Sequence, residues 1–311
     1  MNRRDLLRSA GLAAAALAFR APLAACSREG MPGDHPPADP DHERLARWSE
    51  SLRAERLVPP DAPLGRAATR VGELAAGTPY EAHTLEAYID RGNPVASEPL
   101  TLSLTRFDCV TLVEVCLAVA RASQDGAPAS WEAFGHEVER MRYRDGLRRG
   151  YASRLHYFSE WIEDGERRGL VKDVGQKLGG VDDRRPLRFM TTHRESYPAL
   201  ADDTVFRQIG EIERRLEDRP RYVIPTDRIP EVADRIESGD VLAFATGIPG
   251  LDVTHAAFAY RDEVNTLRVL HAPLSGGVVE VTAKTLPEYV AAIRRSTGIL
   301  VARPKWAPVS P

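Results

Sequence analysis

The chain has 311 residues and a formal net charge of −3, with 43% hydrophobic and 28% charged residues. This length and apolar content allow one domain or two small ones with an ample core. The nearly balanced charge gives no reason to expect a nucleic-acid partner or an acidic polymer. Nucleotide binding has no support either, because no GxGxxG or GxxxxGK[ST] loop is present.

The first 25 residues have the features of an export signal. Twin arginines at positions 3 and 4 precede an apolar stretch, 10–19, that is too short to span a membrane. The segment Leu23–Cys26 then resembles a bacterial lipobox, whose cysteine is lipidated and becomes the mature N-terminus. Ordinary cleavage after Ala25 would put a leucine where a small residue is preferred. We therefore expect 1–25 to be a Tat-like lipoprotein signal peptide and Cys26 to be the lipidation site. A plain secreted protein is the alternative.

Residues 26–45 are rich in proline, glycine and charge, and we expect them to form a disordered tether that leaves 46–311 as the folded domain. Helices are predicted over 42–57 and 63–76. Alternating leucines predict a short strand over 100–105, and the apolar run 110–120 predicts a buried helix.

Cys109 falls in the first turn of that predicted helix, directly after Asp108, a favourable N-cap residue. The unpaired N–H groups and positive dipole of a helix start favour a thiolate over a thiol. Cys116 lies two turns deeper, about 10.5 Å along the axis, which is too far for a disulfide. We expect Cys116 to be core and Cys109 to be accessible. The alternative is that Cys109 is a buried, inert thiol.

The middle of the chain combines predicted helices with an unusual density of polar aromatic and basic side chains. Helices are expected over 131–141, from Ser153 to 168, and over 203–217, and strands over 186–192 and 222–224. The aromatic and basic groups suit a groove that holds a sugar or peptide by stacking and charge-assisted hydrogen bonds. The alternative is a solvated helix with a half-buried aromatic stripe. The candidate substrate-binding residues are Tyr143, Arg144, Arg154, His156, Tyr157, Trp161 and His193.

The C-terminal part changes to closely spaced strands, which favour an antiparallel meander. Strands are expected over 238–246, 254–261, 266–272, 277–282 and 298–303, with a helix over 288–295. A hairpin centred near Glu263 would put His255 directly opposite His271, with Cβ atoms about 4.5–5.5 Å apart. Such a pair offers a base, His255, and a residue that orients it, His271. A slip of one residue would send one of them to the other face.

A cysteine at a helix start, followed by a small sheet that carries histidines and begins with a GD turn at Gly239 and Asp240, resembles the NlpC-type cysteine peptidases of bacterial cell walls. One branch is more similar still, the N-acetylmuramoyl-L-alanine amidase-like family. The resemblance runs from about Tyr80 to Arg303. It rests on the blocks AHTLE (82–86), FDCVTLVE (107–114), YASRLHYFSEWI (151–162), FMTTHRESYP (189–198), YVIPT (222–226), GLDVTHAAF (250–258) and VLHA (269–272). It implies an α+β, papain-like NlpC-type fold in which the cysteine-bearing helix packs on a small antiparallel sheet, with extra helical insertions.

The same resemblance implies that 46–311 is a catalytic cysteine amidase domain with Cys109 as nucleophile, His255 as base and His271 as third residue. The implied reaction cleaves the amide between N-acetylmuramic acid and L-alanine in peptidoglycan fragments, without a metal or other cofactor. The expected partners are these muropeptides and, through the lipid anchor, the inner or outer membrane facing the bacterial periplasm. We expect a monomer and no nucleic acid.

Three alternatives remain open at this point. A related endopeptidase would cut between D-glutamate and diaminopimelate. A zinc hydrolase would use His255, His271 and another ligand, although no HExxH or CxxC spacing supports it. The third is a non-catalytic lipoprotein that binds the cell wall.

Overall fold

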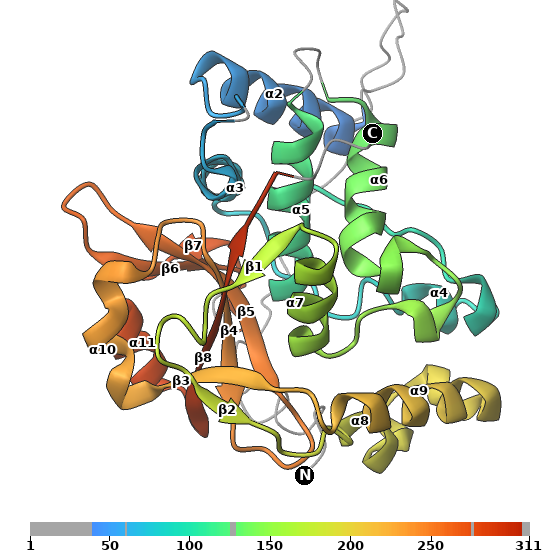
Figure 1. Cartoon of the computed structure of the whole chain (residues 1–311). Coiled ribbons are helices and arrows are strands. Elements are labelled where there is room, and N and C mark those ends of the chain that lie inside the picture. Colours follow the sequence, from blue (N-terminus) through green and yellow to red (C-terminus); the bar gives the residue numbers. More distant parts are fainter. Residues whose placement is uncertain (1–38, 60, 125–128, 275–276, 307–311) are drawn as a thin grey trace, which may run out of the picture.

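The computed structural model describes residues 39–59, 61–124, 129–274 and 277–306. The expected signal peptide, Cys26 and most of the expected tether therefore lie outside the described residues. The described part is an α+β structure built on an eight-stranded sheet in the order β2-β3-β8-β4-β5-β6-β7, with β1 paired to β8 (Figure 1). The strands are β1 Val171–Asp173, β2 Val181–Asp183, β3 Arg221–Pro225, β4 Val241–Thr246, β5 Val253–Arg261, β6 Leu267–His271, β7 Glu280–Val281 and β8 Ser296–Pro304.

The α-helices in these residues are α2 Pro40–Ala54, α3 Leu64–Leu74, α4 Ala87–Asp90, α5 Cys109–Ala122, α6 Trp131–Arg142, α7 Phe158–Arg167, α8 Phe189–Thr192, α9 Asp203–Leu216, α10 Ile229–Val232 and α11 Leu286–Ala292. None of them is long and apolar enough to cross a membrane. The predicted meander β4-β5-β6-β7 is confirmed, and every pairing between named strands is antiparallel.

The central strands are buried on both faces, and alternate residues belong to two different cores. In β4 and β5, Ala243 and Phe258 join the core that includes α2, α3, α5, α6 and α7, whereas Phe244 and Ala257 join the core beneath α10 and α11. Figure 1 shows α10 and α11 on one side of the sheet and α5 and α7 on the other. A third apolar cluster surrounds α9.

Helix α5 begins where the sequence predicts, because two side chains satisfy its first N–H groups. Asp108 Oδ1 accepts a hydrogen bond from the Thr111 N–H at 2.7 Å, and Thr111 Oγ1 accepts one from the Asp108 N–H at 2.8 Å. Farther along, Glu114 accepts a hydrogen bond from Arg142 Nε of α6 at 2.7 Å, with both side chains at most 3% exposed. Removing one partner of such a buried pair costs about 3–5 kcal/mol, so the pair fixes α5 against α6.

The GD turn holds the entrance of β4 in place. Gly239 has φ +89°, and a Cβ at this position would lie 2.2 Å from the backbone of Gly65 in α3, so only glycine fits. Asp240 is buried and accepts two hydrogen bonds from Arg303 of β8, at 2.8 and 2.9 Å. The turn therefore joins α3, β4 and β8.

Two of the expectations near the N-terminus are wrong. The expected tether ends before residue 45, because α2 begins at Pro40 and Leu45 is buried. The segment 100–105 is not a strand. Its backbone instead pairs with side chains: the Leu104 N–H donates to Asp41 Oδ1 at 2.7 Å, and the Thr101 carbonyl accepts from Arg142 at 2.6 Å. The alternating leucines pack against the core around α5, although the segment is not a strand.

In the middle of the chain, Ser153 does not cap a helix that continues to residue 168. It ends a 3₁₀ turn, and α7 begins later, at Phe158. The expected strand over 186–192 is also wrong, because residues 189–192 form the helical turn α8. Its start is held by the Gly250 carbonyl, which accepts from both the Arg188 and the Phe189 N–H at 3.0 Å. This long-range contact overrides the strand preference of the local sequence.

Candidate active site

The two cysteines in the described part of the chain have different surroundings. Cys109 is the first residue of α5 and is half-buried, so a reagent or substrate can reach it. Cys116 is fully buried among apolar side chains, and burial raises the pKa of its thiol far above the ordinary value. The prediction that Cys116 belongs to the core is confirmed, and Cys109 is the thiol suited to chemistry.

The two histidines of the meander meet, although not in the predicted register. Phe258 pairs with Leu270, so the hairpin is centred near Val264 and not near Glu263. Continued along the strands, this register makes His255 and His271 diagonal neighbours and not direct partners. The shift is two residues, which keeps both side chains on one face of the sheet. His255 Nε2 lies 2.8 Å from His271 Nδ1, a hydrogen-bond distance.

Aromatic rings from β4 and α11 support this pair. The buried ring of Phe244 stacks on the His255 ring, with 5.6 Å between ring centroids, and also contacts the Tyr289 ring of α11, with 5.5 Å between centroids. The Tyr289 hydroxyl lies 3.3 Å from His271 Nδ1. Burial, followed by the nearby Cys109 and Glu280, raises the pKa of Tyr289 to about 12. Cys109 is therefore within electrostatic reach of a tyrosine that contacts His271.

The site keeps both imidazoles neutral. Burial, with a smaller contribution from His271, lowers the pKa of His255 to about 3. Burial also lowers the pKa of His271 to about 4. Neutral imidazoles at neutral pH have a free ring nitrogen that can accept a proton from a neighbouring thiol.

Three of the seven candidate substrate-binding residues are interior residues. Tyr143 is fully buried and donates to Glu98 Oε1 at 3.0 Å. Tyr157 is 1% exposed and donates to Glu213 Oε1 at 2.6 Å. Trp161 is 3% exposed and belongs to the core around α5. The expectation that these rings wall an open groove is wrong, because all three are buried and the hydroxyls of Tyr143 and Tyr157 donate to glutamates of the protein.

The two candidate arginines have partners within the fold. Arg154 is 5% exposed, lies 2.6 Å from Glu86 Oε1 and stacks over the Tyr151 ring at 4.8 Å. Arg144 donates to both carboxylate oxygens of Glu160, at 2.7 and 2.9 Å. Their charges are compensated by the protein itself, which gives them a structural role in this state.

The two remaining candidates are half-buried histidines in the helical part. His156 Nε2 lies 2.8 Å from the Tyr151 carbonyl. His193 Nδ1 lies 2.8 Å from the Phe189 carbonyl, and its ring stacks on that of Phe189. A substrate contact for either histidine stays a prediction.

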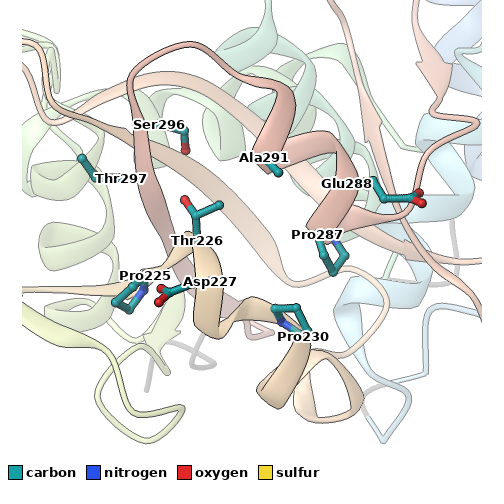
Figure 2. A pocket seen from close by; sticks show the side chains of 9 residues that line it. All are labelled: Pro225, Thr226, Asp227, Pro230, Pro287, Glu288, Ala291, Ser296 and Thr297. Carbon is teal, nitrogen blue, oxygen red and sulfur yellow. The ribbon is translucent and has the colours of Figure 1, made fainter.

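A pocket of about 670 Å³ lies beside α11 and is lined by residues from the end of β3 and the segment after it, from α11 and from the start of β8 (Figure 2). None of Cys109, His255 and His271 lines it. Pro287, Glu288 and Ala291 face this pocket, while Tyr289 of the same helix contacts His271. The pocket is therefore separate from the histidine pair. Within the described residues, no group of three or more His, Cys, Asp or Glu residues could hold a metal ion.

Sequence reasoning missed Phe244, Tyr289 and Glu280. Glu280 pairs with His271 across β6 and β7, and its Oε1 lies 3.8 Å from His271 Nε2. A register drawn between the predicted strands 266–272 and 277–282 could have found Glu280. Tyr289 could not be found in this way, because nothing in the local sequence says where α11 docks.

Comparison with known proteins shows the family of the chain. The model of the N-acetylmuramoyl-L-alanine amidase-like family matches residues 70–299. A solved N-acetylmuramoyl-L-alanine amidase from Bacteroides uniformis is 33% identical, with 78% of this chain and 99% of that chain covered and a TM-score of 0.71. A Bacteroides fragilis protein provisionally named a xylanase is 34% identical, with 75% and 99% covered and a TM-score of 0.68. No protein with a curated description matches.

The chain belongs to the N-acetylmuramoyl-L-alanine amidase-like family. A Legionella pneumophila protein that is 19% identical, with 86% and 94% covered and a TM-score of 0.61, shares the fold. The expected family and α+β class are confirmed. The papain-like, NlpC-type description stays a prediction.

The lowered histidine pKa values predict how stability depends on pH. Unfolded histidine has a pKa of about 6.5, so the unfolded chain takes up protons below that pH. In the folded protein, His271 stays neutral until about pH 4 and His255 until about pH 3. The resulting stability is complete above pH 6.5 and is lost as the pH falls toward 4. Between pH 7 and 5, the wild type should lose free energy of unfolding more steeply than His271→Asn, by up to about 1.4 kcal/mol per pH unit.

Urea unfolding at several pH values measures this difference. His136→Asn, at an exposed histidine of α6, is the control and should keep the wild-type slope. A His271→Asn protein that is more sensitive to acid than the wild type would mean that the folded pair binds a proton.

Proposed function

We propose that this protein is an N-acetylmuramoyl-L-alanine amidase that cleaves the amide between N-acetylmuramic acid and L-alanine in peptidoglycan fragments. Family membership supports the amidase class. The observation that carries the cysteine mechanism is the 2.8 Å contact between His255 and His271. The half-buried Cys109 is close enough to help raise the pKa of Tyr289, whose hydroxyl contacts His271. A glycosidase such as a xylanase would instead need a pair of carboxylates at the bond to be cut.

In the proposed mechanism, the sulfur of Cys109 attacks the lactyl carbonyl carbon, and its proton passes to His255. The first N–H groups of an α-helix point out of its N-terminal end, so the backbone N–H of Cys109, the first residue of α5, is suited to donate to the developing oxyanion. His255 then protonates the alanine nitrogen as the C–N bond breaks. Water, deprotonated by His255, hydrolyses the thioester and releases the lactyl carboxylate and the free thiol.

The buried site favours forming the Cys109 thiolate and the His255 imidazolium together. An imidazolium alone is unfavourable there, because burial lowers the pKa of His255 to about 3. Proton transfer from Cys109 creates a thiolate next to the imidazolium, so each charge stabilises the other. The positive end of α5 stabilises the thiolate further.

The nucleophile can be tested with the two cysteines of the same helix. Cys109→Ala should lower kcat by more than about a thousandfold, because the mechanism loses the atom that forms the thioester. Cys116→Ala, the matched control, should keep activity. In the wild type, iodoacetamide should label Cys109 faster than Cys116 near pH 7. Equal, slow labelling of both cysteines would remove the support for a cysteine enzyme. So would an activity that is abolished by EDTA but survives alkylation of the cysteines.

A preference for small substrates follows from the proposed fragment specificity. Soluble muramoyl-peptides should be cut much faster than intact sacculi at matched bond concentration, because the chain shows no repeated wall-binding module to hold a polymer. Mass spectrometry of the products measures both the rate and the bond. Products that begin with L-alanine support the amidase. Products cut between D-glutamate and diaminopimelate would favour the endopeptidase.

We also propose that the protein is exported and anchored in the bacterial periplasm by lipid on Cys26. The support is the lipobox-like sequence before this cysteine, at residues 23–26. Cys26→Ala should release the protein from membranes into the soluble fraction, because one or more acyl chains provide the binding energy. Cell fractionation after a salt wash measures the change. A variant that still sediments with membranes would contradict the lipid anchor.

A further inference from the structure

We propose that Tyr289 and Glu280 are positioning residues that keep the proton of His271 on Nε2, so that His255 donates through Nε2 and offers Nδ1 to Cys109. The inference rests on the proposed cysteine mechanism and assigns two residues that this mechanism does not otherwise need. Both residues approach His271 from elements other than its own strand: Glu280 from β7 and Tyr289 from α11.

The first step is the Nε2 side of His271. This atom is buried and has no hydrogen-bond partner within the described residues. Glu280 Oε1 lies 3.8 Å from this atom, on a side chain that is 48% exposed. A carboxylate accepts hydrogen bonds and repels a lone pair. Glu280 therefore favours the tautomer of His271 that has its hydrogen on Nε2.

The second step is the Nδ1 side of the same ring. His255 Nε2 approaches Nδ1 at 2.8 Å, and the Tyr289 hydroxyl approaches it at 3.3 Å. The Tyr289 ring stands nearly perpendicular to the imidazole, at 84°. With its pKa raised to about 12, the phenol keeps its proton and can donate it. A phenol donor facing Nδ1 favours the tautomer of His271 without hydrogen on this atom, in agreement with Glu280 at the other end of the ring.

The third step follows along the hydrogen bond to His255. When His271 Nδ1 accepts, His255 Nε2 must carry the hydrogen, and the neutral His255 ring then has its lone pair on Nδ1. This is the tautomer that can take the thiol proton. The opposite arrangement, with hydrogen on His271 Nδ1, would leave hydrogen on His255 Nδ1 and remove the base. It would also point a lone pair at Glu280.

Nitrogen NMR of the protein with ¹⁵N-labelled histidine tests the tautomer directly, without any substrate. The chain has 8 histidines, and His271→Asn identifies the signals of His271. At pH 7 we expect Nε2 of His271 to have the shift of a protonated nitrogen and Nδ1 that of an unprotonated one. The reverse assignment would overturn the proposal, whether or not the protein is an amidase.

Two variants test the consequence for the reaction. Tyr289→Phe and Glu280→Ala should each lower kcat about 10- to 100-fold, the range typical of lost outer hydrogen-bond partners, with KM within about twofold. Each should also move the pH profile of Cys109 alkylation upward, because the thiolate loses part of its imidazolium partner. Glu280 is half exposed, so truncating it leaves no buried cavity.

The matched controls lie in the same sheet, away from the pair. Tyr260→Phe removes the tyrosine hydroxyl of β5 that donates to Glu73 at 2.9 Å, and Glu263→Ala removes an exposed carboxylate in the β5–β6 turn. Both controls should keep the wild-type kcat and alkylation profile. If Tyr289→Phe and Glu280→Ala also keep them, the proposal is wrong while the amidase mechanism stands. A wild type with no turnover and an ordinary alkylation profile near pH 8.5 would instead refute the proposed function.

Discussion

The start of α5 is the constraint on which the rest of the candidate site depends. Asp108 and Thr111 satisfy each other's backbone N–H groups, so the helix can begin only at Cys109. Burial of almost every later residue of α5, with the internal pair of Glu114 and Arg142, then fixes the helix against β5 and α6. The thiol of Cys109 therefore lies at the positive end of a helix whose later turns are packed in the core.

The second constraint is electrostatic. The sheet holds His255 and His271 in an apolar setting formed by Phe244 and α11, which disfavours a lone positive charge. The four ring nitrogens of the pair, with the Tyr289 hydroxyl and the Glu280 carboxylate, then decide where protons can lie. A neutral base in such a setting becomes charged most easily when a thiolate forms beside it, which suits chemistry that begins with proton transfer.

In the helical part of the chain, side chains of the types that bind ligands have a structural role instead. Tyr143, Tyr157 and Arg154 have the composition of a ligand groove, yet each is buried and bonded to a glutamate of the protein. Buried polar groups must be satisfied, and charged acceptors give strong hydrogen bonds. The sequence cannot say whether the partner of such a side chain is a ligand or a distant glutamate.

The sequence by itself determined the elements whose signals are local. The cap at Asp108, the apolar run of α5, the strands of the meander and the family blocks are all readable from neighbouring residues, and the structure and the comparisons confirm them. The pairing of His255 with His271 was foreseen, but its register was two residues out, because the turn sets the register. Only the tertiary structure decided that 100–105 is not a strand, that 189–192 is helical, and that Tyr289 faces His271. These outcomes depend on long-range docking, in which distant groups compete for backbone and side-chain hydrogen bonds, and no local pattern encodes that competition.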